Sequence, residues 1–451
     1  MAEIYKPKAI SGYPEWLPEQ RAVELKWLDK LRDLFESYGY CSIETSAVEE
    51  IPVLTSKGES ADKEIYAISR LAEQSIDKKN VNTTKKSKLG LHYDLTVPFA
   101  RYVAQNFSKL DFPFKRYQIQ KVWRGERPQE GRFREFYQCD IDVINQDNLP
   151  LFFDVEILQI MHKALSLLEL GNIEIRISNR KILQGSLEVL GVKNIQNAIR
   201  ILDKKDKLGD EKIATLLADN SEEKLNKKQI QSCIELINIK NSKDLSKDIL
   251  STIKEPNQEL KAGIKELEDV ISEIDNPDFV VDLSIARGFD YYSGSIFEAK
   301  FTDFPEFSTI ASGGRYDKLA NSFIRNELPG IGMSIGLTRI FSKALSEGLI
   351  KTSAKSPTNV LIAYLEGSEK SKLNNIANEI RKRNFNVELY HVVDKLKKQI
   401  RYADRKGIKY VLFPSKDSPA NNSSVKTTKN EVKNLENGKQ EEIDIQNFDF
   451  S

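Results

Sequence analysis

Two alternating stretches on either side of a Gly/Pro turn constrain the fold more than any other feature of this sequence. "FPFKRYQIQKVWR" precedes "GERPQE", and "GRFREFYQCDIDVI" follows it. Side chains alternate between the two faces of a strand. In the second stretch one face holds Phe133, Glu135, Tyr137, Cys139, Ile141 and Val143, and the other holds Arg132, Arg134, Phe136, Gln138, Asp140 and Asp142. The first set is largely apolar and can pack on a core, so the pattern predicts an antiparallel strand pair with one polar face.

The polar face has two interpretations. Antiparallel sheets often expose one face to water, so this could be an ordinary solvated surface. Three details favour a binding surface: the cations are Arg although Lys is commoner in the chain, Phe136 is aromatic, and the acids lie farther from the turn than the cations. Arg offers a rigid fork for phosphate or carboxylate, and an aromatic ring can stack on another flat ring. The face therefore predicts a floor for a ligand with a phosphate end and an ammonium end.

The totals set broad limits on the molecule. A chain of 451 residues predicts several domains rather than one core. Because the net charge is only +1, any nucleic acid must be bound by a local patch. The three cysteines form no CxxC pair, which indicates a reducing cytosol without a disulfide frame or zinc knuckle. The sequence offers neither an apolar run near the roughly 20 residues of a membrane span nor the apolar core of a signal peptide at its start.

Composition and periodicity divide the chain into five parts. Residues 1–178 contain two helical patterns, "PEQRAVELKWLDKLRDLFESYGY" and "LPLFFDVEILQIMHKALSLLEL". Residues 179–276 are rich in Lys, Asp and Asn and helical in period, which predicts an inserted helical domain. Strand character returns over 277–350. After a linker at 351–358, residues 359–451 alternate strand and helix and predict a separate α/β domain with an open sheet.

Two further segments have weaker patterns. "EIYAIS" and "LGLHYDLT" are typical of two strands, and the polar "DKKNVNTTKKSK" between them is typical of an exposed hairpin loop. The tail after Pro414 is rich in Asn, Lys and Glu and indicates little about structure.

Four motifs together resemble one protein family. "FKRYQIQKVWRGERPQEGRFREFYQCDID" resembles motif 2 of class II aminoacyl-tRNA synthetases, and specifically that of the histidyl-tRNA synthetase family. "IARGFDYY" resembles the histidine-binding signature of that family, "SGGRYD" its second signature, and "GIGMSIGLTRI" its motif 3. They occur in the family's order, which makes the resemblance specific. "LHYDLTVPFARYVAQN" is more similar to the eukaryotic and archaeal branch than to the common bacterial form.

The resemblance implies a fold and a reaction. The expected fold is α+β, with a six-stranded antiparallel catalytic sheet flanked by helices, a helical insertion and a C-terminal α/β anticodon-binding domain. The expected protein is a cytoplasmic homodimer. It would join L-histidine to ATP, giving histidyl-adenylate and pyrophosphate, and then transfer histidine to the 3′ end of tRNA(His). ATP would enter with Mg²⁺, although no metal-binding cage is visible in the sequence.

The resemblance assigns five residues to ATP. Arg124 would contact the α-phosphate and the amino acid carboxylate. The alternative interpretation of Arg124 is a surface ion pair. Glu126 would accept from the adenine amino group, Arg132 would reach the outer phosphates, and Phe136 would stack on adenine. Arg339 would cover the other adenine face, or else form a salt bridge at a helix start.

Arg287 is the second residue, with Arg124, that the resemblance makes catalytic. In the family an Arg at this position of "IARGFDYY" lies beside the α-phosphate. Adenylation is an in-line attack by a carboxylate on phosphorus, so placement and charge stabilisation dominate.

The resemblance also assigns nine residues to histidine. They are Asp94, Thr96, Gln138, Asp142, Tyr291, Tyr292, Tyr316, Gly313 and Gly314. The first three match positions that hold the α-ammonium, while Asp142 and Tyr292 match positions that reach the imidazole. A carboxylate and a phenol there would reject apolar analogues by leaving buried polar groups unpaired. For each Tyr core packing is an alternative, and for the two glycines a plain turn is an equally good interpretation.

The C-terminal part carries a local excess of positive charge. Residues 369–409 hold twelve Lys/Arg and five Asp/Glu, a net charge of +7. A solvated helical face is the ordinary explanation of such a run. Because the family places its anticodon-binding domain here, we expect phosphate contacts and recognition of unpaired bases instead.

Two departures and two rivals remain at this level. Ser46 stands where the family usually has Pro, and His92 where relatives often have Arg. The main rival is the non-catalytic synthetase paralogue that regulates ATP phosphoribosyltransferase; it lacks the anticodon domain and has lost ATP contacts that are present here. The other is a synthetase-like module of a kinase that senses uncharged tRNA, but the chain has no kinase signature.

Overall fold

A computed structural model describes residues 4–56, 64–70, 87–129, 131–220, 222–242, 244–286, 292–318, 320–352, 354–414 and 430–451. The chain forms two compact units. One consists of Met1–Pro14 and Trp27–Leu349, and the other of Glu15–Lys26 and Ile350–Ser451.

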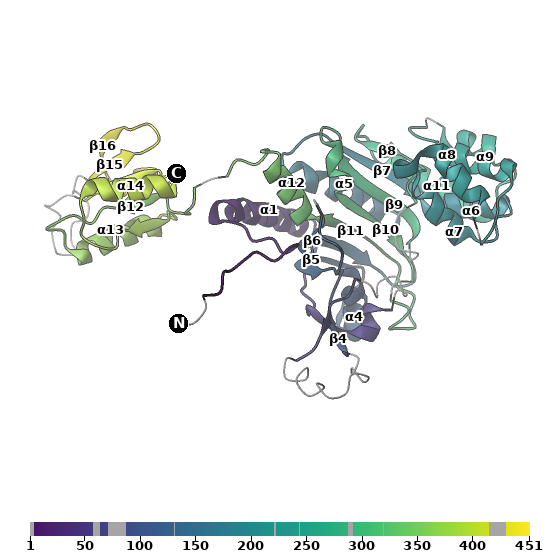
Figure 1. The fold of residues 1–451 in the computed structure, drawn as a ribbon, viewed down its shortest axis with the longest axis horizontal. Helices are drawn as coiled ribbons and strands as arrows, with labels where there is room; N and C mark the ends of the chain where they lie inside the picture. The colour runs from purple at the N-terminus through teal and green to yellow at the C-terminus, as the bar shows by residue number, and fades with distance from the viewer. Residues whose placement is uncertain are drawn as a thin grey trace. The chain divides into compact units, whose positions relative to one another are not determined.

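A large mixed sheet forms the centre of the first unit (Figure 1). In spatial order its strands are β1 (Cys41–Ser42), β5 (Phe114–Trp123), β6 (Glu135–Ile144), β11 (Gly330–Gly336), β10 (Ala311–Tyr316), β9 (Tyr292–Phe301), β7 (Ile173–Asn179) and β8 (Phe279–Val281). The six central strands pair antiparallel, whereas β1 and β8 pair parallel with β5 and β7 at the edges. The expectation of six antiparallel strands was therefore wrong in number and in type. Strands of two and three residues are too short to produce an alternating pattern.

The predicted strand pair is the best-formed part of this sheet. β5 and β6 pair from Phe114 with Ile144 to Trp123 with Glu135. Cys139, Ile141 and Val143 are fully buried, as the apolar face requires. The polar face is also largely buried, since Gln138, Asp140 and Asp142 are at most 6% exposed. The interpretation as a solvated outer face was therefore wrong for this end of β6.

Helices cover the sheet in the first unit. They include α1 (Pro18–Ser37), which belongs to this unit from Trp27 onward, α4 (Thr96–Asn106), α5 (Phe152–Ser166), α12 (Leu337–Ser346) and the short η3 (Pro305–Phe307). The short α2 (Ile51–Leu54) and η2 (Phe107–Lys109) both contact α4. Both predicted helices are confirmed: α1 starts at Pro18 and is followed by Gly39 at φ 78°, and α5 buries Ile157, Leu158 and Met161. Glycine adopts this positive φ without the steric cost that other residues incur.

The weaker hairpin prediction is partly confirmed. β2 (Val48–Glu50), β4 (Leu89–Leu91) and β3 (Ala67–Ile68) form a small antiparallel sheet in the order β2-β4-β3. The expected strands at "EIYAIS" and "LGLHYDLT" are thus present but short. Residues 77–86 of the expected loop lie outside the described residues.

The described residues of the inserted segment form six helices. They are α6 (Arg180–Val189), α7 (Ile195–Leu202), α8 (Lys205–Ala218), α9 (Lys227–Ile237), α10 (Leu245–Thr252) and α11 (Gln258–Ser272), and Figure 1 shows them gathered beyond β9. The Asn-rich composition has a structural cause, because Asn179, Asn194, Asn226 and Asn257 each cap the N-terminus of a helix. α6 contacts β9 and α11 contacts β7, which joins the helices to the large sheet.

The second unit contains an open α/β sheet. Its elements are β12 (Val360–Ile362), α13 (Lys370–Lys382), β13 (Val387–Leu389), α14 (Leu396–Lys406), β14 (Tyr410–Phe413), β15 (Asn430–Asn434) and β16 (Gln440–Ile443), with strand order β13-β12-β14-β15-β16. The predicted alternation is confirmed. The tail adds two antiparallel strands and buries Phe450 fully in the core, although its polar composition gave no such indication.

Candidate active site

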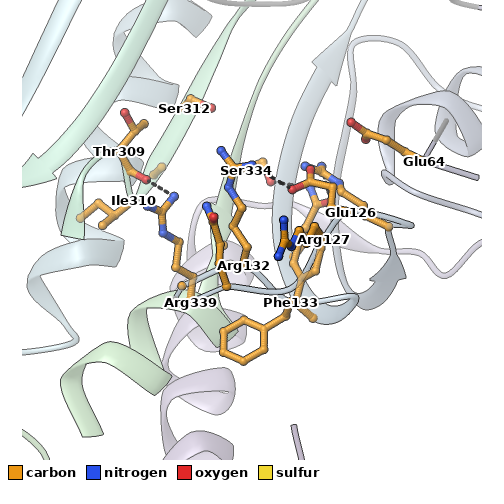
Figure 2. Close-up of a pocket in the computed structure, with 17 residues that line it drawn as sticks. Glu64, Glu126, Arg127, Arg132, Phe133, Thr309, Ile310, Ser312, Ser334 and Arg339 are labelled. Atoms are coloured by element: carbon orange, nitrogen blue, oxygen red, sulfur yellow. Dashed lines mark hydrogen bonds and ion pairs between the residues drawn. The ribbon is translucent and has the colours of Figure 1, made fainter. Parts of the chain in front are cut away.

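A cleft of about 700 Å³ opens over the cation-rich end of the polar face (Figure 2). Its lining comes from the segment before β3, from the segment between β5 and β6, from β6 itself, and from the segments around β10, β11 and α12. The lining residues are Glu64, Arg124, Glu126, Arg127, Gln129, Gly131, Arg132, Phe133, Phe136, Gln138, Thr309, Ile310, Ala311, Ser312, Ser334, Gly336 and Arg339. All five residues assigned to ATP are among them, so the structure brings this predicted set together.

Arg124 is held in place from two sides. Its Nε donates to the carbonyl of Tyr93 at 3.0 Å, and its guanidinium carbon lies 5.1 Å from the ring centroid of Phe136. Its Nη2 donates to Oε1 of Gln138 at 3.5 Å. A planar guanidinium fixed in this way can bind two anionic oxygens with little further loss of side-chain freedom.

The other two arginines of the predicted set lie at the mouth of the cleft. Arg132, half exposed, has its Nη1 3.5 Å from Oε2 of Glu126. Arg339, in the first turn of α12, donates from Nη1 to the carbonyl of Thr309 at 3.3 Å (Figure 2). An exposed ion pair of the first kind contributes little energy, so a phosphate can compete for Arg132.

Asp142 occupies the opposite, acidic end of the polar face. Nη2 of Arg116 lies 2.5 Å from its Oδ2, and the hydroxyl of Tyr316 donates to its Oδ1 at 2.7 Å. Arg116 is fully buried, with its guanidinium carbon 4.2 Å from the ring centroid of Phe99. Burial and the Asp142 carboxylate raise the pKa of Tyr316 well above its usual range, so this phenol stays a donor.

The remaining described residues assigned to histidine lie at element ends or inside strands. Asp94 is buried and accepts from the backbone of Val97, which places it at the start of α4 beside Thr96. Tyr292 begins β9 and pairs in register with Tyr316 of β10. The structure therefore gathers Asp142 with Tyr316, and Tyr316 with Tyr292, from three different strands.

Gly313 and Gly314 lie within strand β10, so the interpretation as a plain turn was wrong. A Cβ on Gly313 would lie 2.2 Å from the carbonyl oxygen of Gly332, and one on Gly314 would lie 2.6 Å from that of Ser295. Both glycines therefore allow close strand packing. Gly332 was not predicted and has a more direct role, since a Cβ there would lie 2.0 Å from Oδ1 of Asp142.

Comparison with known proteins identifies the family. The family profile described as histidyl-tRNA synthetase matches residues 12–340, and that of an anticodon-binding domain matches residues 359–449. A histidine–tRNA ligase from Thermobifida fusca is 48% identical over 98% of this chain and 98% of its own. The chain belongs to the histidyl-tRNA synthetase family. A histidine–tRNA ligase from Micrococcus luteus is 39% identical over 97% of this chain and 94% of its own.

Solved structures agree with this family. Histidyl-tRNA synthetase from Nostoc sp. PCC 7120 has a TM-score of 0.84 at 33% identity, covering 98% of this chain and 97% of that chain. A Bacillus halodurans protein described as an ATP phosphoribosyltransferase regulatory subunit/histidyl-tRNA synthetase has a TM-score of 0.73 at 17% identity, covering 91% of this chain and 99% of that chain. The second likeness shows a shared fold.

Several histidyl-tRNA synthetase predictions fall outside the site as described. Arg287 and Tyr291 lie outside the described residues. His92 is buried: its ring stacks on Trp123 at 5.5 Å between centroids, and its Nε2 lies 2.7 Å from the carbonyl oxygen of Lys121. Burial lowers its pKa, so its imidazole packs as a neutral ring in the interior. At Ser46 the side-chain oxygen accepts from the backbone of Val48 at 3.2 Å, which stabilises a local turn.

Four residues near the site had no role assigned from the sequence: Arg116, Asp140, Ser334 and Glu64. A signal existed for the first, because pairing β5 with β6 sets Arg116 opposite Asp142. Asp140 and Ser334 pair between β6 and β11, strands that are far apart in the sequence. Glu64 lines the cleft near Arg124, and burial raises the pKa of its carboxyl.

Three general findings complete the description of this family member. The three cysteines are all free. Within the described ranges, His, Cys, Asp and Glu side chains form no group of three or more that could bind a metal ion. Across that same part of the chain, every helix is too short or too polar to span a membrane.

Proposed function

We propose that the protein is a histidine–tRNA ligase. It activates L-histidine with ATP to histidyl-adenylate and pyrophosphate, and then transfers the histidyl group to the 3′ end of tRNA(His). The observation that supports this most strongly is the continuity of the polar face, because Arg124 contacts Gln138 at one end of β6 and Asp142 lies on the same strand four residues farther along. A nucleotide and a small zwitterion can therefore lie side by side on one floor.

In the first step the histidine carboxylate attacks the α-phosphorus of ATP. A new oxygen–phosphorus bond forms as the bond to the β-phosphate oxygen breaks, and pyrophosphate leaves with that electron pair. Arg124 would bridge the carboxylate and the α-phosphate, which repel each other in water, and Arg287 would stabilise the charge that grows at phosphorus. Both roles agree with the family's motifs.

The other ATP contacts would come from residues that line the cleft. Arg132 would leave Glu126 for the outer phosphates, and Glu126 would then accept from the adenine amino group. Phe136 and Arg339 would lie on the two faces of the adenine ring. Mg²⁺ would enter with ATP as part of the substrate and shield its outer phosphates.

Histidine would lie with its ring toward Asp142. The Asp142 carboxylate and the Tyr292 phenol are suited to the two ring nitrogens, while Tyr316 and Tyr291 would enclose the ring. Asp94, Thr96 and Gln138 would hold the α-ammonium, and the close packing at Gly313 and Gly314 would shape the wall. An apolar analogue would leave Asp142 buried without a ligand partner, which is the basis of specificity.

The larger organisation follows the same proposal. Residues 1–178 and 277–350 would form the catalytic domain around the insertion 179–276, and residues 359–451 would bind the anticodon after the linker 351–358. Exposed Lys and Arg on α14 would supply phosphate contacts in this last part. The active form would be a cytoplasmic homodimer.

Pyrophosphate exchange tests the proposal against its main rival. A ligase exchanges labelled pyrophosphate into ATP when histidine is present, and not when other amino acids replace it. The alternative, a non-catalytic paralogue that regulates ATP phosphoribosyltransferase, would bind histidine without exchange. The complete set of cleft arginines and the anticodon-domain match favour the ligase. Histidine binding without any exchange would favour the regulator.

A further inference from the structure

The buried carboxylate of Asp140 lies in the floor of the site, between Gln138 and Asp142 on β6. Asp140 is on β6, two residues from both Gln138 and Asp142, and is 2% exposed. In register it stands between Gln118 of β5 and Ser334 of β11. Gln138 and Ser334 both line the cleft, so Asp140 lies directly behind two residues that a ligand can touch.

Hydrogen bonds give the Gln138 amide one orientation. Its Nε2 donates to Oγ of Ser334 at 2.7 Å and to Oδ1 of Asp140 at 3.4 Å. The Ser334 side chain in turn hydrogen-bonds to the Asp140 carboxylate. Both amide hydrogens are thus occupied, and Oε1 is the atom that accepts from Arg124 at 3.5 Å. Gln118 does not compete, since its Nε2 donates to Thr45 and Gln120.

We propose that Asp140, together with Ser334, is a positioning residue for histidine recognition that holds the Gln138 amide with its oxygen toward the α-ammonium of the substrate. The proposal rests on the proposed function, because Gln138 is assigned to the ammonium there. An ammonium group only donates hydrogen bonds and needs acceptors. A flipped amide would turn its NH₂ group toward the ammonium and set two acceptors, Oε1 and the carboxylate, against each other.

The charge on Asp140 decides whether this arrangement holds. The pKa of Asp140 is raised to about 7: burial is the largest cause, Asp142 and Asp94 also raise it, and Arg116 of β5 and the Ser334 hydroxyl of β11 lower it. An ionised Asp140 accepts only, which fixes the amide as observed. A protonated Asp140 can donate to Oε1 and permits the flipped amide. Asp140→Asn should imitate the protonated state at every pH.

Two histidine analogues separate this role from a general loss of structure. Histidinol retains the ammonium and lacks the carboxylate, whereas 3-(imidazol-4-yl)propionate retains the carboxylate and lacks the ammonium. For Asp140→Asn at pH 8 we expect the inhibition constant of histidinol in pyrophosphate exchange to rise about tenfold or more, the scale of a lost hydrogen bond to a charged group. The constant for the propionate should change less than about twofold. Equal weakening of both analogues, or no change in either, would overturn the proposal.

A double variant tests whether Asp140 acts through Gln138. If it does, the double variant Asp140→Asn/Gln138→Ala should have the same KM for histidine as Gln138→Ala alone. Effects that multiply would overturn the proposal. Asp154→Asn is a matched control, since Asp154 is a fully buried carboxylate paired with Arg315, and it should leave the ratio of the two inhibition constants unchanged.

Ser334→Ala keeps the test open if Asp140→Asn does not fold. It removes one acceptor of the Gln138 amide, so it should weaken histidinol selectively, by a smaller factor. An unchanged ratio of the two constants in Ser334→Ala would also overturn the proposal. Absence of histidine-dependent exchange in the wild-type protein would instead overturn the proposed function, and this inference with it.

Discussion

Replacing Arg116 by Met is a sharp test of the acidic end of the polar face of β6. Arg116 is fully buried, and its guanidinium lies 2.5 Å from Asp142, which is 5% exposed in its side chain. Met keeps much of the apolar length of the side chain but removes the charged guanidinium that lies over the Phe99 ring. Asp142 would then remain in the interior without its cation.

Two limits set the expected cost. If Asp142 stays ionised, removing one partner of a buried pair costs about 3–5 kcal/mol. If Asp142 takes up a proton, the cost at pH 7 is about 4 kcal/mol, because each pH unit above an ordinary pKa near 3.9 costs about 1.4 kcal/mol. The cost of protonating Asp142 decreases as the pH is lowered. In the variant the folded pKa of Asp142 would exceed the unfolded one, so stability would decrease as pH rises. If Asp142 takes up a proton, the loss of unfolding free energy relative to wild type should therefore be about 2 kcal/mol smaller at pH 5.5 than at pH 7.

Urea unfolding followed by tryptophan fluorescence measures this loss, since Trp27 and Trp123 both belong to the first unit. Adding Asp142→Asn to Arg116→Met should recover part of the stability, with a coupling of at least about 1.5 kcal/mol. Lys115→Met is the matched control on the same strand: its partly exposed pair with Glu156 should cost about 1 kcal/mol or less. A loss in Arg116→Met no larger than that in Lys115→Met, or losses that simply add, would refute the reasoning, whereas a pH-independent loss would show that Asp142 stays ionised.

Three further predictions follow from the site and the second unit. Arg287→Ala should leave folding intact and slow adenylate formation about 10²-fold or more, the scale of losing one charge-stabilising donor; pyrophosphate exchange near the wild-type rate would argue against its role. Three exposed residues lie at i, i+4 and i+8 of α14: Lys397, Arg401 and Arg405. Replacing all three by Ala should raise the KM for tRNA and reduce its salt dependence while pyrophosphate exchange stays unchanged. Equal losses in tRNA charging and in exchange would contradict this. The ratio of the histidine KM of Asp140→Asn to that of wild type should rise from about one at pH 6 to about ten at pH 8, because the pKa of Asp140 is about 7. The ionisation of histidine itself cancels in this ratio. A ratio that does not change with pH would contradict the prediction.

The sequence predicted those parts of the site that lie on one strand or one turn. Period-two alternation located the polar face of β6, and the Gly/Pro turn placed Arg124, Glu126 and Arg132 near Phe136 in one cleft. The long helices α1 and α5 were equally clear, because each has a full apolar stripe and a recognisable start.

What could not be predicted depends on contacts between distant segments. Ser334 reaches Gln138 only because β11 pairs with β6 across a long sequence separation. Phe450 is a similar case. It lies in the polar tail but is buried against Phe385 and Tyr410, which lie far upstream in the sequence. Arg116 is different, because the predicted strand pair already sets it opposite Asp142. Edge strands of two or three residues carry too few side chains for any period to appear.

Resemblance to the family added roles that residue patterns alone do not supply. The segment "LHYDLTVPFARYVAQN" resembles the eukaryotic and archaeal branch, whereas the relatives named above are bacterial proteins. His92, in the same segment, stands where relatives often have Arg, and its ring is stacked in the interior on Trp123.

A crystal structure with histidine and a non-hydrolysable ATP analogue would test the central claim most directly. We predict the imidazole within hydrogen-bond distance of Asp142, the ammonium beside Oε1 of Gln138, and the α-phosphate within reach of Arg124, all in one continuous cleft. Histidine bound away from Asp142, or a nucleotide bound away from Arg124, would contradict the account.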